Sequence, residues 1–241
     1  MDESIIRDIL AQGLPTLGID QECIPQLIEF SRLLLEKNQV MNLTAITEPR
    51  EVATLHLLDS LAVAAAGDLA GKKVIDVGTG AGFPGVPLAI ALPNASLTLL
   101  DSLGKRVTFL EETCRALGLQ NVTCVHARAE EFAAAHRESY DVAVSRAVAA
   151  LPVLCELCLP LVKVGGVFLA MKSSHSQEET EQAAKAISLL GGKLEDVTDY
   201  SIPTTDVTHR LLVIRKLSPT PKKYPRRFAQ IKKQPLGLPG V

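Results

Sequence analysis

Lys73-Val-Ile-Asp-Val-Gly-Thr-Gly-Ala-Gly-Phe-Pro-Gly85 is the stretch that decides the fold of this 241-residue chain. Its start, Val74-Ile-Asp-Val77, places one acid among three β-branched apolar side chains, which is typical of a central strand buried on both faces. Glycines follow at Gly78, Gly80, Gly82 and Gly85. Because glycine has no Cβ, this backbone can turn sharply and approach a ligand closely. With a helix expected from Val86, the stretch predicts a strand–loop–helix nucleotide site.

The spacing of the glycines bears on which nucleotide binds. Read from Gly80, the pattern G-x-G-x-x-G of dinucleotide sites is present, but read from Gly78, next to the strand, Phe83 occupies the third glycine position. The alternative pattern, an acid and an apolar residue followed by G-x-G-x-G, covers Asp76 to Gly82. It resembles the first motif of class I methyltransferases, which use S-adenosylmethionine. We therefore favour S-adenosylmethionine over NAD.

Composition and length limit the class of protein. The first residues, Met1-Asp-Glu-Ser4, are acidic where a signal peptide needs a basic region, and no run of about 18 apolar residues predicts a membrane span. Five scattered cysteines suggest reduced thiols, so we expect a cytoplasmic protein. Cys155-x-x-Cys158 lies in an apolar helical pattern, and we interpret it as packing and expect no metal site.

The charge of the chain is unevenly distributed. Eight of its 25 basic residues and none of its 27 acidic ones lie between Arg215 and Val241, which leaves 17 basic residues against 27 acidic ones elsewhere. Such asymmetry indicates a polyanionic partner, and Tyr224 and Phe228 interleave the charges with faces for stacking. We expect RNA contacts from Lys222, Lys223, Tyr224, Arg226, Arg227, Lys232 and Lys233. The alternative is a solvated tail.

The order of apolar patterns predicts three parts. Residues 1–70 read as an N-terminal helical lobe, including a helix over Glu48–Ala66. Residues 71–217 alternate strands and helices, which implies an α/β domain with a mostly parallel sheet, and residues 218–241 form the basic tail. In such sheets ligands bind at the carboxyl ends of the strands. Gly78, Asp101, Glu130 and Arg146 all follow predicted strand ends.

Asp101 ends the predicted strand Ser96-Leu-Thr-Leu-Leu100. It lies about 20 residues beyond the glycine loop, where nucleotide-binding folds place a carboxylate on ribose hydroxyls. The alternative is that it caps the next helix, Lys105–Leu117, and the two roles are compatible. We favour ribose binding.

Six segments together resemble one family, the RsmG (GidB) family. They are Asn42-Leu-Thr-Ala-Ile-Thr47, His56-Leu-Leu-Asp-Ser-Leu61, Asp76-Val-Gly-Thr-Gly-Ala-Gly-Phe-Pro-Gly85, Leu100-Asp-Ser-Leu-Gly-Lys-Arg106, Ser145-Arg-Ala147 and Lys223-Tyr-Pro-Arg226. The resemblance spans about Asn38 to Leu236. It implies a class I, Rossmann-like methyltransferase that transfers a methyl group from S-adenosylmethionine to N7 of one guanosine in bacterial 16S ribosomal RNA.

The resemblance also implies roles for single residues. The cofactor residues are expected to be Asp76, Gly78, Gly80, Gly82, Phe83, Asp101, Ser102, Ala129, Glu130 and Arg146. Arg146 is the candidate for orienting base or cofactor; the alternative is an ion pair with an acid such as Glu130. Asn42 and His56 are RNA candidates, although on the residue pattern alone we favour a hydrogen-bonded polar patch at the lobe junction for His56, Asp59 and Ser60. No general base is expected.

Other interpretations remain open at this point. A NAD-dependent oxidoreductase is the enzymatic alternative, and an RNA-binding ribosome assembly factor without activity is the third. We expect a monomer whose partner is small-subunit ribosomal RNA, either naked or in a partly assembled particle.

Overall fold

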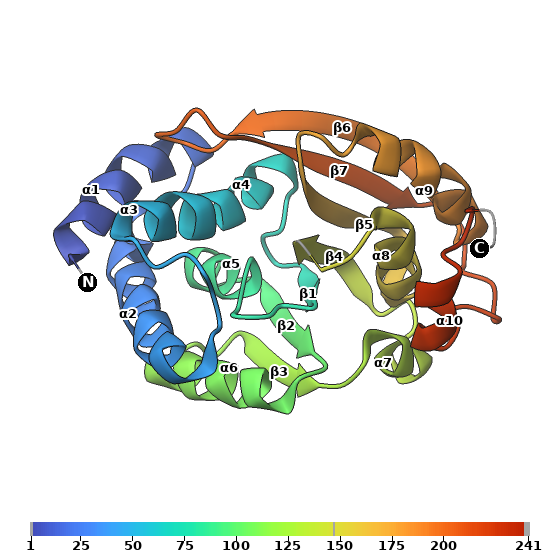
Figure 1. Ribbon diagram of the computed structural model, residues 1–241, viewed down its shortest axis with the longest axis horizontal. Coiled ribbons are helices and arrows are strands. Elements are labelled where there is room, and N and C mark those ends of the chain that lie inside the picture. Colours follow the sequence, from blue (N-terminus) through green and yellow to red (C-terminus); the bar gives the residue numbers. More distant parts are fainter. Residues whose placement is uncertain (1, 147, 239–241) are drawn as a thin grey trace.

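A seven-stranded sheet lies at the centre of the computed structural model, which describes residues 2–146 and 148–238 (Figure 1). The strand order is β3-β2-β1-β4-β5-β7-β6. Strands β1 to β5 pair in parallel, and β7 runs antiparallel between β5 and β6. The predicted mostly parallel α/β sheet is confirmed. The strands are β1 (Lys73–Val77), β2 (Ser96–Asp101), β3 (Val122–His126), β4 (Tyr140–Arg146), β5 (Val162–Ser173), β6 (Gly192–Ser201) and β7 (Thr208–Lys216).

Helices cover both faces of the sheet, each face with its own hydrophobic core. One core is built from side chains of the helices that precede β3. These are α1 (Glu3–Gly13), α2 (Ile24–Met41), α4 (Asp59–Ala66), α5 (Gly85–Ala91) and α6 (Gly104–Ala116), with the helical segment Val52–Leu58 and short helical turns at Leu14–Leu17 and Gln21–Cys23. The short helix α3 (Pro49–Glu51) buries no side chain. The other core takes side chains from α7 (Ala129–Ala135), α8 (Leu151–Cys158), the turn Leu159–Leu161, α9 (Gln177–Leu189) and α10 (Phe228–Lys233).

The glycine stretch folds as β1, a loop and α5. Val74 to Val77 are buried, as expected for a strand between β2 and β4. The buried carboxylate of Asp76 accepts a hydrogen bond from the backbone N–H of Gly85 at 2.8 Å. A Cβ on Gly82 would approach Val86 to 2.7 Å, and this residue also has a φ of +101°, so close packing and backbone conformation both require glycine there. The loop is therefore held from below by its own strand.

The N-terminal lobe packs against the sheet face rather than forming its own core. Leu10, Phe30 and Leu57 belong to the same core as Val86 and Leu110. The predicted helix over Glu48–Ala66 is helical throughout from Pro49, but its middle, Val52–Leu58, is π-helical. The division into 1–70, 71–217 and 218–241 remains an interpretation, and its residues 1 and 239–241 lie outside the described residues.

Other features bear on the predictions of class. Within residues 2–146 and 148–238, no helix is long and apolar enough to cross a membrane. The same residues contain no group of three or more His, Cys, Asp or Glu side chains placed to hold a metal ion. Cys155 and Cys158 lie on α8, where both are fully buried, in agreement with a packing role.

Candidate cofactor and substrate site

A cavity of about 470 Å³ opens at the carboxyl ends of β1 and β2. This cavity, named here the loop cavity, is lined by residues of the glycine loop, the β2–α6 turn, the N-terminal lobe and the end of β4. They include Thr44, His56, Gly78, Gly80, Phe83, Asp101, Ser102, Arg106 and Arg146. Its place at the strand ends is the one expected for a parallel sheet.

The glycine loop forms one wall of the loop cavity with bare backbone. Gly78 and Gly80 both have positive φ angles, and a Cβ on Gly80 would meet only the carbonyl oxygen of Gly78, at 3.9 Å. The N–H of Gly80 donates to the Asp101 carboxylate at 3.0 Å. At Gly80 this wall therefore leaves room for a ligand to lie directly against the backbone, whereas at Gly78 the side chain of Val148 already lies 2.7 Å from the place of a Cβ.

Asp101 connects the two loops that line the cavity. One carboxylate oxygen accepts from Gly80, and the other accepts from the N–H of Leu103 at 2.8 Å. Arg106 approaches the same carboxylate to 3.7 Å. The helix after β2 begins at Gly104 with Leu103 as its N-cap, so Asp101 does not take the capping position considered from the sequence. A carboxylate offers more acceptor sites than these contacts use, so it can still accept from hydroxyl groups.

A smaller cavity of about 140 Å³ continues from Asp101 and Ser102 toward β3, and we name it the β3 cavity. Ala129 and Glu130 line it from the start of α7. Its far wall includes Phe228 from α10, over whose ring the guanidinium of Arg128 lies at 5.7 Å. A flat, largely apolar group would fit between these walls.

Phe83, His56 and Arg146 form a packed cluster at the other end of the loop cavity. The imidazole of His56 stacks on the ring of Phe83 with centroids 4.3 Å apart, and the guanidinium of Arg146 lies 4.9 Å from that ring. A hydrogen bond of 2.7 Å joins Nε2 of His56 to the hydroxyl of Thr44. Burial and then the charge of Arg146 lower the pKa of His56 to about 4, so its imidazole is neutral near pH 7.

Asp59 is the acid that holds Arg146. An Nη1 hydrogen of Arg146 bonds to its carboxylate at 2.9 Å, and Nη1 also donates to the carbonyl oxygen of Leu55 at 3.0 Å. The ion-pair partner is thus not Glu130, because Glu130 lies in the β3 cavity, whereas Asp59 reaches Arg146 from the N-terminal lobe. Tyr200 and His209 donate to the other oxygen of Asp59, each at 2.8 Å.

The balance of forces keeps Asp59 ionised. Burial by itself would raise its pKa, but the hydrogen bond from His209 and the charge of Arg146 outweigh it and hold the pKa below the ordinary value. In turn the hydrogen bond to Asp59 raises the pKa of His209. The polar patch expected around His56, Asp59 and Ser60 is therefore an ion-pair network that fixes Arg146 at the cavity wall.

Three of the expected site residues, Asp76, Asn42 and Gly82, lie outside the cavities. Asp76 is fully buried beneath the loop, where burial raises its pKa to about 6. Asn42 ends α2 in a left-handed conformation (φ 49°), with its side chain exposed. Gly82 also packs into the core beneath the loop rather than against the cavity. Ala147, the last residue of the Ser145-Arg-Ala motif, lies outside the described residues.

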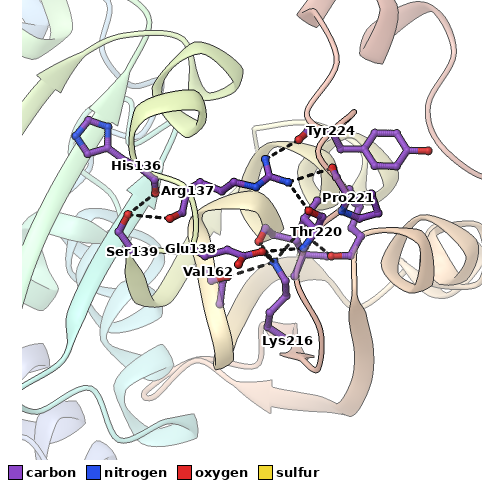
Figure 2. A network of polar contacts seen from close by, with 11 residues as sticks. His136, Arg137, Glu138, Ser139, Val162, Lys216, Thr220, Pro221 and Tyr224 are labelled. Atoms are coloured by element: carbon purple, nitrogen blue, oxygen red, sulfur yellow. Dashed lines mark hydrogen bonds and ion pairs between the residues drawn. The ribbon is translucent and has the colours of Figure 1, made fainter.

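The basic tail is anchored to the domain by a polar network around β7, shown in Figure 2. Arg137 donates to backbone carbonyl oxygens of Thr220, Pro221 and Tyr224. Glu138 accepts from the N–H of Thr220 at 2.7 Å. Lys216 is fully buried and donates to the hydroxyl of Thr220 and to a carbonyl oxygen at the start of β5, and burial lowers its pKa to about 8. The tail therefore leaves β7 along a fixed path.

Arg226 fastens the tail a second time. Its guanidinium forms three hydrogen bonds of 2.6, 2.9 and 3.2 Å with Glu156, which is fully buried on α8, and also donates to the carbonyl oxygen of Gln234. Tyr224 is buried as well. These contacts revise the interpretation of both residues, because side chains engaged in this way hold the tail instead of facing solvent. The exposed cations of the tail are Lys222, Lys223, Arg227, Lys232 and Lys233.

Several cavity residues escaped the sequence reasoning. Thr44 and Arg106 lie within the family-like segments, but the residue pattern assigned them no role. Tyr200 and His209 come from the hairpin β6–β7, and their contacts to Asp59 span 141 and 150 residues. No local pattern signals such contacts. Phe228 was expected only as a stacking face, and its position in the β3 cavity depends on how the tail folds back.

The chain is similar in sequence to one family of proteins over most of its length. Residues 23–208 match the family model GidB, described as rRNA small subunit methyltransferase G. A protein of Alkaliphilus oremlandii named ribosomal RNA small subunit methyltransferase G is 51% identical over 96% of this chain and 99% of its own length. A protein of the same name from Acetivibrio thermocellus is 45% identical over 98% of this chain and 100% of its own.

Solved structures share the fold at low sequence identity. A SAM-dependent O-methyltransferase from Thermotoga maritima superimposes with a TM-score of 0.52 and 18% identity, over 78% of this chain and 73% of its own. TrmN from Thermus thermophilus gives a TM-score of 0.52 at 21% identity, over 66% of this chain and 48% of its own. The fold is thus that of class I methyltransferases.

Proposed function

Since this chain belongs to the GidB family of rRNA small subunit methyltransferase G proteins, we propose that it methylates N7 of one guanosine in 16S ribosomal RNA, with S-adenosylmethionine as the methyl donor. The observation that carries the proposal is that the family match over residues 23–208 includes the loop cavity. The comparisons give no support to a NAD-dependent oxidoreductase or to an assembly factor without activity.

The residues around the two cavities fit S-adenosylmethionine. We propose that the Asp101 carboxylate accepts from the ribose hydroxyls, since it is fixed by Gly80 and Leu103 and keeps free acceptor sites. The β3 cavity would take adenine between Ala129 and Phe228, with Ser102 and Glu130 at its edge. The methionine part would lie along Gly78 and Gly80, toward Phe83 and Arg146. Asp76 and Gly82 would support this site from beneath.

The chemistry places few demands on the protein. When bound, S-adenosylmethionine supplies an electrophilic methyl group on a positively charged sulfur. Guanine N7 has an in-plane lone pair and carries no proton, so its attack needs no general base. The protein's task is then to hold N7 in line with the methyl–sulfur bond, which is rate acceleration by positioning. The neutral His56 suits such a site, because it adds no cation next to a base that gains positive charge.

We further propose that RNA meets the exposed cations of the tail. Lys222, Lys223, Arg227, Lys232 and Lys233 face solvent on a segment whose path is fixed by Arg137 and Arg226. Positive side chains on a fixed surface suit contacts to phosphates. Asn42 and His56 remain RNA candidates on the N-terminal lobe. The monomeric state and the cytoplasmic location also stay predictions.

Methyl transfer to RNA tests the proposal directly. Small-subunit ribosomal RNA that lacks the modification is incubated with the protein and radiolabelled S-adenosylmethionine, both as naked RNA and as assembled small subunits. The expected result is one methyl group per RNA, with the RNA backbone becoming cleavable at that guanosine by treatments specific for N7-methylguanosine. A product methylated at N1 or N2, or no product on either substrate, would overturn the proposal.

A further inference from the structure

A third cavity, of about 660 Å³, lies next to the loop cavity, and we name it the β5 pocket. His56 and Arg146 line both, so the two spaces meet at this pair of side chains. The β5 pocket continues over the carboxyl end of β5, where Met171 pairs with Arg146 of β4 and Ser173 pairs with His209 of β7. A group held here would reach the loop cavity beside His56 and Arg146.

The lining of the β5 pocket suits a flat heterocycle. Ile46, Leu55, Met171 and Val207 supply aliphatic surface from four different segments. Polar side chains, among them Lys172, Glu179 and His209, line the rest of the pocket. Pockets of a few hundred Å³ with apolar walls and few, fixed polar groups are typical of sites that orient a small ring system.

Among the residues that the structure describes, the carboxylates that line the β5 pocket belong to Asp59 and Glu179. They differ in whether one carboxylate oxygen is left without a hydrogen bond. Both oxygens of Asp59 are engaged by Arg146, Tyr200 and His209. In Glu179, Oε1 accepts from the ammonium of Lys172 at 2.7 Å and from the N–H of Leu151, whereas Oε2 accepts from none of the residues that the structure describes. The side chain of Glu179 is 25% exposed. It is thus a fixed carboxylate with one free oxygen that lines the pocket.

Arg146 supplies a donor at the part of the pocket that is shared with the loop cavity. Its Nη1 group is used by Leu55 and Asp59, but Nε donates to no residue in the described ranges. The β5 pocket therefore has a donor at the end shared with the cofactor and an acceptor on Glu179. Guanine has the complementary pattern, since N7 and O6 are acceptors on one edge, while N1–H and the N2 amino group are donors away from N7.

We propose that the β5 pocket receives the target guanine flipped out of the RNA, with O6 accepting from Arg146, with N7 unbonded and facing the loop cavity, and with the N2 amino group donating to Glu179. The assignment rests on the proposed function and adds the residue that selects the base. Adenine presents a donor where guanine has O6 and lacks the N2 amino group, so it would oppose Arg146 and leave Glu179 unsatisfied. Glu179 is thereby a specificity-determining residue.

Replacing the target guanosine by inosine tests this contact, because inosine lacks only the N2 amino group. Wild-type protein and the variant Glu179→Gln are each assayed for kcat/KM on small-subunit RNA ligated with guanosine or inosine at the mapped position. A hydrogen bond to a charged group predicts that the wild type loses roughly 10- to 100-fold on inosine. The Glu179→Gln variant, whose amide oxygen can accept only a weaker, neutral hydrogen bond, should lose several-fold less than the wild type on the same exchange.

The matched control is Glu178→Gln, which makes the same charge change on the neighbouring, exposed residue of α9 and should keep the wild-type penalty. Affinity for S-adenosylmethionine should be unchanged in both variants. If Glu179→Gln does not fold, Glu179→Asp, which withdraws the carboxylate while keeping its charge, takes its place in the comparison.

The outcomes separate the two proposals. A full inosine penalty in the Glu179 variant, or none in the wild type, would overturn the assignment of the β5 pocket and leave the proposed function standing. A wild-type protein that does not methylate N7 of guanosine at all would overturn the proposed function itself.

Discussion

At the scale of single residues, two buried aspartates near the glycine loop have different surroundings. Asp101 faces the loop cavity, whereas Asp76 lies beneath the loop and contacts the N–H of Gly85. The sequence motif groups them as one cofactor signature. The geometry separates an acid that can touch the ligand from an acid that shapes the loop.

Substituting the two acids should therefore give different results. Asp101→Ala removes an acceptor for the ribose hydroxyls, worth roughly 1.5–3 kcal/mol, and should weaken binding of S-adenosylmethionine about 10- to 100-fold. Asp76→Asn keeps an oxygen for Gly85 and should change the affinity less than about threefold. Titration calorimetry on both variants measures this. Equal losses of affinity in the two would show that Asp76 also touches the ligand.

The protonation states at the cavity wall predict a simple pH profile. The pKa of His56, lowered to about 4, lies well below the working range, and Asp59 is ionised because its pKa is also lowered. Neither group changes charge between about pH 6 and 9, and attack by N7 releases no proton from the base. His209, whose pKa is raised by its hydrogen bond to Asp59, can lose its proton in that range, but it takes no proton from the base, so the single-turnover rate should show at most a shallow step and otherwise stay nearly flat. A rate that rises tenfold per pH unit would contradict this and indicate a general base.

At the scale of elements, α10 and the segment 217–227 that leads to it attach the tail to the domain. Arg226 pairs with Glu156, which is fully buried on α8, and Phe228 lines the β3 cavity. The segment that carries the exposed cations is thus also part of a cofactor wall. Removing the ion pair and removing the aromatic wall should have separable effects.

Arg226→Ala should destabilise the fold by about 3–5 kcal/mol, because it leaves the buried charge of Glu156 without its cation and with only the backbone N–H of residue 226 as a donor. Arg227→Ala removes the same charge from the next residue, which is exposed, and should stay within about 0.5 kcal/mol of the wild type. Urea unfolding of both variants gives the comparison. Equal, small effects would mean that the pair at Glu156 does not hold the tail.

Phe228→Ala should weaken S-adenosylmethionine binding without unfolding the protein. The ring is only partly buried, and removing an aromatic wall from one side of adenine costs roughly 1–3 kcal/mol by analogy with base stacking, or about 5- to 100-fold in affinity. Ala229→Ser, a change at the exposed neighbour, serves as the control. Unchanged affinity in Phe228→Ala would place adenine elsewhere.

Sequence patterns predicted the elements well where the signal is local. The glycine loop, the positions of strands β1 to β5 along the chain and the cations of the tail all follow from composition and periodicity within a few residues. Contacts between residues far apart in the sequence could not be predicted from these local patterns. Asp59 lies 87 residues from Arg146, and nothing near Arg146 marks it as the partner, so the nearer strand-end acid Glu130 was considered instead. The burial of Tyr224 and the free oxygen of Glu179 likewise depend on tertiary packing.

At the scale of the whole molecule, the proposed cofactor site and the proposed base site lie over different strands of the sheet. The cofactor cavities lie over β1 to β3, and the β5 pocket lies over β4, β5 and β7, so the two halves of the sheet meet at Arg146. In Figure 1 the N-terminal helices and α10 lie at opposite ends of the long axis, with the sheet between them. An RNA that reaches the β5 pocket and the tail together must lie along the face that carries the strand ends.

The anchored tail predicts how RNA binding responds to salt. Each phosphate neutralised by a lysine or arginine releases a counterion, so the logarithm of affinity falls linearly with the logarithm of salt concentration. Replacing the exposed residues Lys222, Lys223, Arg227, Lys232 and Lys233 by Ala should make that slope shallower by about one unit for each phosphate that is no longer neutralised. Affinity for S-adenosylmethionine should be retained, because none of the five lines the cavities.

The matched control replaces Lys72 and Lys163, which lie at the opposite, amino ends of β1 and β5, and should keep the wild-type slope. An unchanged slope in the tail variant would mean that the tail is a solvated terminus without phosphate contacts. The RNA contacts would then be assigned to the N-terminal lobe.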